Sequence, residues 1–292
     1  MAIDNGDLRA LLKAVPMARD LEGRIWRMAI EGQHVFVAAR TGGGKGSWIW
    51  ALVLGLAPAW QAGLVKLWGA DPKRLELAIA PGWWDHYADD NASVVEMLET
   101  AVEGLNERNA QLKGKARKFT PGPNTPLNVL IIDEMGYLAG LLPDKKLRER
   151  AQTAISTILA LGRAGGYSVV GCVQDPRKET CGFRDLFPIR IAGGLDNATM
   201  VDLVLGDGMR DAGALCDRIP LPPHGAGVAY VLEETTRKPR LVRAPWCSDE
   251  TIRSVLARYA VPALPEADAV KDEPLDITGP LPAVGRWQFK IE

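Results

Sequence analysis

Short aliphatic runs alternate along the chain with longer stretches whose apolar residues recur three or four positions apart. Runs of the first kind, bounded by Gly, Pro or Asp, predict buried strands, and stretches of the second kind predict amphipathic helices. The predicted strands lie at 34–39, 64–70, 127–133, 168–173 and 188–192, followed by a β pair at 227–233 and 239–242. The predicted helices lie between them, at 44–56, 93–112, 145–163 and 197–205.

The order of these elements predicts the fold class. Strands that alternate with helices form parallel βαβ units, and near-continuous aliphatic strands are typical of a sheet that helices cover on both faces. The sequence therefore predicts an α/β fold with a mostly parallel sheet flanked by helices.

The two ends of the chain differ from this alternating middle. Residues 1–30, with apolar positions that include Leu8 and Leu12, predict a short amphipathic N-terminal helical arm. Residues 250–292 predict one short helix and a proline-rich tail. From Pro262 on, the tail holds five prolines, six acids and three bases, which favours an extended, solvated segment over the alternative of a docking peptide.

Composition narrows the classes of protein that fit. Of the 292 residues, 47% are hydrophobic and 24% are charged, so wholly disordered and collagen-like chains are excluded. The formal net charge of −1 excludes a chain coated in positive charge but is compatible with a basic strip that binds nucleic acid. The four cysteines lie far apart without a CxxC pair, which disfavours a zinc site or a disulfide framework. The longest uncharged apolar stretch, 48–60, is shorter than the roughly 20 residues of a membrane-spanning helix, so we expect a cytoplasmic protein.

A glycine-rich segment directly after the first predicted strand has the chemistry of a phosphate-binding loop. Glycines let successive backbone N–H groups turn toward one anion, a lysine reaches the outer phosphates, and a helix N-terminus adds its positive dipole end. A purely structural strand-to-helix turn is the alternative. The candidate nucleotide-binding residues are Thr41, Gly42, Gly43, Gly44, Lys45, Gly46 and Ser47.

This loop departs twice from the strict GxxxxGK[ST] pattern. Ala39 replaces the first glycine, and Gly46 stands where a Mg²⁺-binding hydroxyl is usual. Ser47 lies about 100° further round a helix and does not simply substitute for that hydroxyl.

Carboxylates and an amide follow two further predicted strands. Asp133 and Glu134 end an aliphatic run, and Gln174 ends the next predicted strand. A carboxylate at a buried strand end can hold Mg²⁺, its neighbour can orient or deprotonate an attacking water, and an amide can sense the γ-phosphate. Each could instead be a polar strand end that meets solvent. Their order after a glycine-lysine loop favours a nucleotide site.

Longer segments carry a family signature. The segment from Trp68 to Leu77 reads WGADPKRLEL, residues 161–167 read LGRAGGY, and residues 187–192 read FPIRIA. These segments resemble the DPKRxEL, GRAAGIH and PTRIAF segments of the FtsK/SpoIIIE family of DNA translocases. The resemblance covers roughly residues 34–249, and the Gly-Lys-Gly-Ser loop is similar to that of actinobacterial conjugative-plasmid, mobile-element or phage members.

The resemblance implies a RecA-like P-loop ATPase core at 31–249 that takes ATP and Mg²⁺ and assembles as a homo-oligomer, a hexameric ring. Lys45 would hold the phosphates, and Asp133 would hold Mg²⁺ through water. Glu134 would polarise the attacking water, and Gln174 would report the γ-phosphate.

Two arginines in the resembling segments are candidates for a residue that acts from the neighbouring subunit. Arg163 or Arg190 would stabilise charge in the transition state. The sequence does not choose between them, and a surface ion pair is the alternative for each.

Double-stranded DNA is the implied cargo, held through its phosphates in the centre of the ring. Lys145 and Lys146 match a lysine-containing loop of the family and are the favoured DNA contacts, with a solvated helix start as the alternative. A membrane-protein partner that recruits the chain to the membrane is left open. A second basic segment contains Lys113, Lys115, Arg117 and Lys118.

Three functions therefore compete. The first is an ATP-driven translocase of double-stranded DNA that acts as a ring, in plasmid or mobile-element transfer or a similar movement of DNA. The second is a secretion-type ATPase of the same superfamily that moves single-stranded DNA or protein. The third is a nucleotide-binding assembly protein that hydrolyses ATP weakly because Gly46 weakens the metal site.

Overall fold

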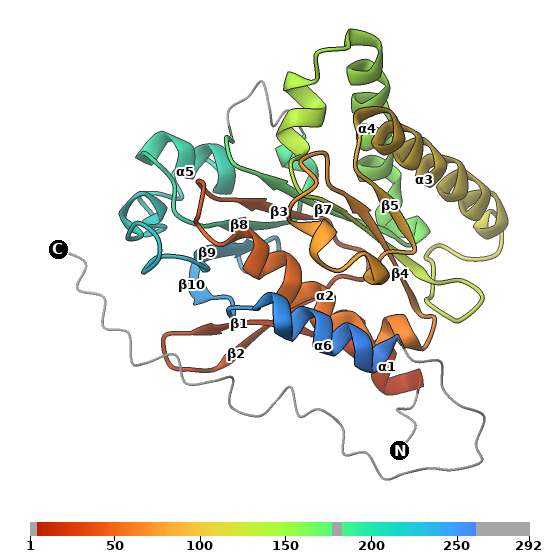
Figure 1. Cartoon of the computed structure of the whole chain (residues 1–292), viewed down its shortest axis with the longest axis horizontal. Coiled ribbons are helices and arrows are strands. Elements are labelled where there is room, and N and C mark those ends of the chain that lie inside the picture. Colours follow the sequence, from red (N-terminus) through yellow and green to blue (C-terminus); the bar gives the residue numbers. More distant parts are fainter. Residues whose placement is uncertain (1–4, 177–182, 261–292) are drawn as a thin grey trace.

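The computed structural model describes residues 5–176 and 183–260, which form one large mixed sheet with helices on both sides (Figure 1). The strands are β1 Val15–Asp20, β2 Ile25–Met28, β3 Val35–Ala38, β4 Val65–Ala70, β5 His86–Ala88, β6 Leu127–Ile132, β7 Tyr167–Val173, β8 Ile189–Ala192, β9 Val228–Glu233 and β10 Arg240–Arg243. The α-helices are α1 Asn5–Lys13, α2 Lys45–Gln61, α3 Asn91–Leu112, α4 Lys145–Gly165, α5 Ala198–Leu205 and α6 Asp249–Tyr259.

The sheet has a parallel part and an antiparallel extension. Its strand order is β2-β1-β10-β9-β8-β3-β7-β6-β4-β5, and the six strands from β8 to β5 run parallel. The other four pair antiparallel, beginning with β9 beside β8. The mostly parallel α/β sheet predicted from the aliphatic runs is thus confirmed, and each predicted strand and helix of the middle region is present with shifted ends.

Two apolar cores lie on opposite faces of the sheet. In β3, Val35 and Val37 point into one core and Phe36 and Ala38 into the other, because successive side chains of a strand alternate between faces. Helices α1, α2 and α6 cover the first face, and α3, α4 and α5 cover the second. Burial on both faces explains why the central strands read as near-continuous apolar runs.

The helix predicted across residues 1–30 is wrong beyond Lys13, because β1 and β2 follow α1 and extend the sheet. The buried residues Val15 and Met17 stand two apart, which fits a strand, whereas Leu8 and Leu12 stand four apart and fit the helix that α1 forms. Strand β1 pairs with β10, with Arg19 opposite Arg243, so its partner is distant in sequence.

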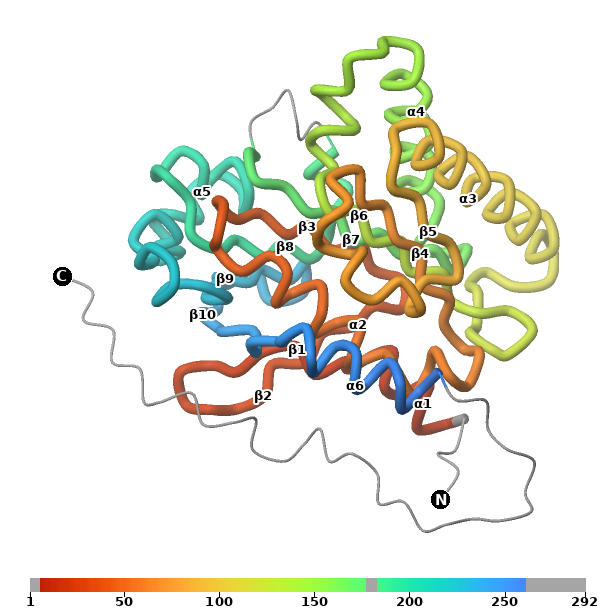
Figure 2. The backbone as a smooth tube through the Cα atoms, viewed as in Figure 1, coloured from red at the N-terminus to blue at the C-terminus, as the bar shows by residue number. Residues whose placement is uncertain are grey.

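The C-terminal segment is described only in part. Helix α6 confirms the short helix expected after residue 249 and packs beside α2 (Figure 2). The proline-rich tail expected from residue 262 lies outside the described residues. In the described ranges, no helix combines the length and apolar character needed to cross a membrane.

Candidate functional site

Three side chains proposed from separate parts of the sequence lie at one edge of the sheet. Lys45 begins α2 after the loop that follows β3, Glu134 follows β6, and Gln174 follows β7. Strands β3, β7 and β6 are neighbours and run parallel, so their carboxyl ends share this edge (Figure 2). Such an edge is the usual ligand position in open α/β sheets.

The loop before α2 has the backbone of an anion cradle. Gly44 takes a left-handed conformation with a φ of 89°, and α2 begins there without a side-chain cap on its N-terminal N–H groups. A Cβ atom on Gly44 would lie 2.2 Å from the Gly227 nitrogen, so only glycine fits. The uncapped N–H groups and the helix dipole therefore favour an anion at this end of α2.

Glu134 lies at the centre of a compact polar cluster. Its Oε2 is 3.6 Å from Lys45 Nζ and 2.8 Å from Lys73 Nζ, and its Oε1 accepts from the Gln174 backbone N–H at 3.2 Å. The side chains of Lys45 and Glu134 are each only 10% exposed, so this ion pair is shielded from solvent. Lys73, which the sequence assigned no definite role, thus contacts the carboxylate proposed to handle water.

The Gln174 amide connects the same cluster to the phosphate loop. We assign its orientation from its neighbours, since O and N are indistinguishable by shape. Its oxygen then accepts from Lys45 Nζ at 3.1 Å and Lys73 Nζ at 3.0 Å, and its nitrogen donates to Thr41 Oγ1 at 3.2 Å. Gln174 can therefore respond to any movement of the loop or of Lys45.

Asp133 is buried beside this cluster, with 6% of its surface exposed. The pKa of Asp133 is raised to about 6, mainly by burial, with Lys45 acting against this shift and the carboxylates of Glu76, Asp71 and Glu134 adding to it. A buried carboxylate among other acids is stabilised by a cation. The surroundings of Asp133 therefore fit the metal role expected of it.

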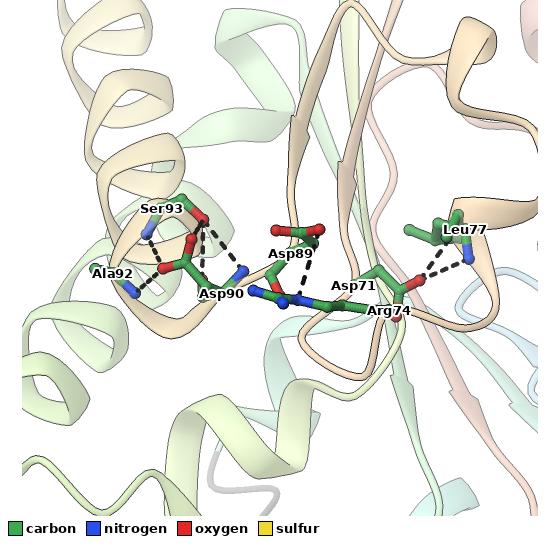
Figure 3. A network of polar contacts seen from close by, with 8 residues as sticks. Asp71, Arg74, Leu77, Asp89, Asp90, Ala92 and Ser93 are labelled. Atoms are coloured by element: carbon green, nitrogen blue, oxygen red, sulfur yellow. Dashed lines mark hydrogen bonds and ion pairs between the residues drawn. The ribbon is translucent and has the colours of Figure 1, made fainter.

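The loop after β4 carries Lys73 and Glu76 into the site. Asp71 is fully buried, and its Oδ2 accepts from the backbone N–H of Leu77 at 2.9 Å and of Ala78 at 3.3 Å (Figure 3). Arg74 on the same loop donates to the Asp89 carbonyl at 2.9 Å, which ties the loop to the end of β5. Asp71 thus braces this loop at the strand end.

Comparison with known proteins gives related sequences. No family model matches the chain. It is 23% identical over 288 residues to "DNA translocase FtsK" of Corynebacterium glutamicum, which covers 89% of this chain and 29% of that protein. It is 28% identical over 187 residues to "Ftsk domain-containing protein YdcQ" of Bacillus subtilis, which covers 60% of this chain and 37% of that protein. The chain thus spans about a third of the length of these relatives.

Solved structures agree with the sequence relatives. The pCW3 conjugation coupling protein TcpA, in its monomer form with ATPγS, superposes with a TM-score of 0.70 at 16% identity, over 88% of this chain and 73% of that one. These relatives confirm the resemblance of the chain to the FtsK/SpoIIIE family, and the superposition shows that it shares the fold of TcpA. The cytoplasmic domain of the Thermomonospora curvata type VII secretion ATPase EccC shares the fold, with a TM-score of 0.66 at 20% identity over 94% of this chain and 34% of that one.

The two candidate arginines, Arg163 and Arg190, lie away from the chain's own phosphate loop. Both line one cavity of about 460 Å³. Arg163 donates to the Gly32 carbonyl, ahead of β3, and pairs with Glu234 at 3.4 Å. Arg190 lies in the first half of β8 and pairs with Asp185 at 3.4 Å. The phosphate loop follows the end of β3, so both arginines lie toward the opposite edge of the sheet.

The two basic segments lie at opposite ends of the helix pair α3 and α4. Lys145 and Lys146 are exposed at the start of α4, on the edge of the sheet that carries the phosphate loop. Residues 113–118 follow the end of α3, which packs on the end of α4 through Arg108 bonds to the Gly165 and Gly166 carbonyls. A helix of 21 residues is about 30 Å long, so the segments do not form one patch.

Part of the site was not predicted from the sequence. Glu76 lies against Gly46, and the segment before β9 packs on the glycines of the phosphate loop, where Gly227 N–H donates to the Gly43 carbonyl at 3.0 Å. A Cβ on Gly42 would lie 3.0 Å from Pro222 Cγ. Only the missing hydroxyl at Gly46 hinted that another residue is needed there.

Proposed function

We propose that this chain is an ATP-hydrolysing motor that moves double-stranded DNA through a ring of identical subunits. The convergence of Lys45, Glu134 and Gln174 at an uncapped helix N-terminus carries this proposal, because it joins an anion cradle to a carboxylate and a sensor. The assigned motor domain is 31–249, with β1 and β2 as an extension of its sheet.

Each residue of the cluster has a separate task in hydrolysis. Lys45 and the loop N–H groups bind the β- and γ-phosphates. Glu134 orients the attacking water and accepts its proton, for which it must first leave the ion pair with Lys73. Gln174 follows the γ-phosphate, since its amide contacts both Lys45 and the loop hydroxyl of Thr41. Nucleotide entry would draw Lys45 away from Glu134 and loosen the cluster.

The residues beside Lys45 fit a magnesium ion. Asp133 is buried among acids, and Gly46 supplies no hydroxyl ligand at the usual position of the phosphate loop. One or two carboxylates suffice to hold Mg²⁺ at nucleotide phosphates, because the ion keeps waters and phosphate oxygens as its other ligands. The ion would neutralise charge at the phosphates, and Asp133 would hold it.

Assembly completes the site. Arg163 and Arg190 lie toward the edge opposite the phosphate loop, so neither serves the loop of its own subunit. Either one would reach the ATP of a neighbour in a homo-oligomeric ring, and a hexamer is the state we propose from the family. Arg163 is paired with Glu234, and Arg190 is paired with Asp185, and both carboxylates are exposed. Breaking exposed ion pairs of this kind costs little free energy, so either arginine could change partner.

Lys145 and Lys146 are the proposed grip on DNA. Among the residues that the structure describes, Lys145 is paired only with Glu149, 3.7 Å away, and its side chain is 78% exposed, so its ammonium remains open to phosphate. Both lysines share an edge of the sheet with the ATP site, whereas Lys113 and its basic neighbours lie a helix length away. Nucleotide-dependent movement would therefore reach Lys145 and Lys146 first.

Steady-state ATP hydrolysis with and without duplex DNA tests the proposal. We expect turnover that DNA stimulates, a loss of about 100-fold or more in Lys45→Ala, and bound but uncleaved ATP in Glu134→Gln. Lys66→Ala, which removes an exposed lysine of β4, is the matched control and should keep wild-type turnover. Unchanged hydrolysis in Lys45→Ala would refute the ATPase assignment.

The secretion-type ATPase remains a second candidate, because the EccC domain shares the fold over 94% of this chain. Turnover without DNA stimulation would favour that candidate, and near-absent turnover with tight nucleotide binding would favour an assembly protein. The likeness to TcpA favours a role in conjugative plasmid transfer, of the actinobacterial plasmid, mobile-element or phage type, with recruitment to the membrane by a partner protein.

A further inference from the structure

At position 46 a glycine replaces the usual hydroxyl residue, and the carboxylate of Glu76 occupies the space beside it. A Cβ atom built on Gly46 would lie 2.3 Å from Glu76 Oε1 and 2.8 Å from Glu76 Oε2. The Glu76 carboxylate therefore fills the volume that a serine or threonine side chain would need. A hydroxyl residue at position 46 and Glu76 in this place exclude each other, because Cβ contacts below about 3 Å are repulsive.

The carboxylate is fixed in that place from two sides. Trp50 lies four residues beyond Gly46 on α2, and its indole N–H donates to Glu76 Oε1 at 2.9 Å. Asp71 holds the backbone immediately after Glu76 through its bonds to Leu77 and Ala78 (Figure 3). Glu76 thus reaches Gly46 as part of a braced loop, and not as a freely rotating side chain.

The Glu76 carboxylate lies near other acidic groups. Asp71 is fully buried, and its Oδ1 has no hydrogen-bond partner in the described part of the chain. Asp71 acts electrostatically on Glu76, and both act on Asp133, while in the described ranges the cation that acts on Glu76 is Lys45. Lys45 would pair with the phosphates of a bound nucleotide. The charge of these acids would then have to be balanced by another cation.

We propose that the Glu76 carboxylate takes the place of the missing loop hydroxyl and holds the Mg²⁺ that accompanies ATP, together with Asp133. The inference rests on the proposed ATPase function and names a ligand that the phosphate-loop pattern does not contain. An oxygen ligand of this kind suits Mg²⁺, which keeps waters and nucleotide phosphates as its other ligands.

Nucleotide binding measured with and without Mg²⁺ tests this role apart from turnover. A fluorescent ADP analogue is titrated in excess Mg²⁺ and in EDTA, and the ratio of the two affinities is compared among variants. Glu76→Gln keeps an acceptor for Trp50 but removes the charge, so the Mg²⁺ ratio should fall by about 10-fold or more while affinity in EDTA is kept. Glu96→Gln, which removes an exposed carboxylate of α3, should keep the wild-type ratio.

The decisive comparison replaces the Glu76 carboxylate by a hydroxyl at position 46 and measures the same Mg²⁺ ratio. Glu76→Ala should lose the Mg²⁺ ratio, and the double variant Glu76→Ala with Gly46→Ser should regain most of it, because the hydroxyl then has room. A wild-type ratio in both Glu76→Gln and Glu76→Ala, with folding verified by circular dichroism, overturns the inference but leaves the ATPase proposal intact. A wild-type chain that binds no nucleotide in either condition overturns both.

Discussion

His34 gives a quantitative test of how the base of the parallel sheet is built. The residue is fully buried just before β3, where its Nδ1 accepts from the Val169 backbone N–H at 3.0 Å. Its Nε2 lies 3.1 Å from the Leu159 carbonyl and must therefore carry the proton. Both ring nitrogens are used by a neutral ring, and a second proton would abolish the bond from Val169.

The expected effect of pH follows from this arrangement. Burial lowers the pKa of His34 to about 4, and the positive charge of Arg163 adds to the decrease. Above pH 6.5 the ring is neutral in both folded and unfolded chains, so it does not affect stability. As the pH falls below 6.5, the unfolded chain binds the proton first, and folding stability is lost until about pH 4. The full loss is about 3 kcal/mol, of which about 2 kcal/mol appears between pH 7 and pH 5.

Urea unfolding at pH 7 and pH 5 measures this loss. His34→Gln cannot titrate, so its stability should fall by about 2 kcal/mol less than that of the wild type between these pH values. Comparison of pH differences removes the cost of the substitution itself. It also removes the effect of Asp133, whose raised pKa acts in the opposite direction and stabilises the fold as the pH falls.

A matched control is His224→Gln, which removes an exposed histidine from the segment before β9 and should keep the wild-type pH difference. If His34→Gln loses as much stability as the wild type between pH 7 and pH 5, the ring is not held neutral and the reasoning fails.

Two further predictions concern the motor. Replacing both Lys145 and Lys146 by alanine should remove DNA stimulation and reduce the slope of log affinity against log salt by about 1.8, at about 0.9 per phosphate contact. Basal hydrolysis should remain, and an unchanged slope would make the basic segment after α3 the leading DNA contact. Arg163→Ala or Arg190→Ala should lose turnover and keep ATP binding. Mixed rings with Lys45→Ala should regain turnover only for the arginine that acts between subunits, and no recovery for either one would exclude both.

Sequence patterns were sufficient to predict the parallel sheet and the functional residues that follow its strands. Strand β6 is buried on both faces, so it is aliphatic apart from Asn128, and its end is marked by the charged pair Asp133 and Glu134. The parallel order of the strands then brings those acids near Lys45 without any detail of packing.

Elements whose partners are distant in sequence were not predictable in the same way. Strand β1 contains Pro16, and its place beside β10 depends on residues more than 200 positions away. Its short run of alternating burial is also compatible with the continuation of an amphipathic helix. The two basic segments show the same limit, because charge is visible in the sequence but the helix length that separates the segments is not.

The contact between Gly46 and Glu76 illustrates a departure from a motif that makes sense only in three dimensions. In the sequence alone, Gly46 indicates that a metal-binding hydroxyl has been lost, which favours a weak ATPase. Glu76 is then only one acid in a loop of mixed charge. In the fold, the absence of a side chain at Gly46 makes the space that the Glu76 carboxylate occupies. Trp50 and Asp71 hold the carboxylate and its loop there, which a chance contact would not require. The glycine is therefore better explained as one half of a replaced metal contact than as damage to the phosphate loop.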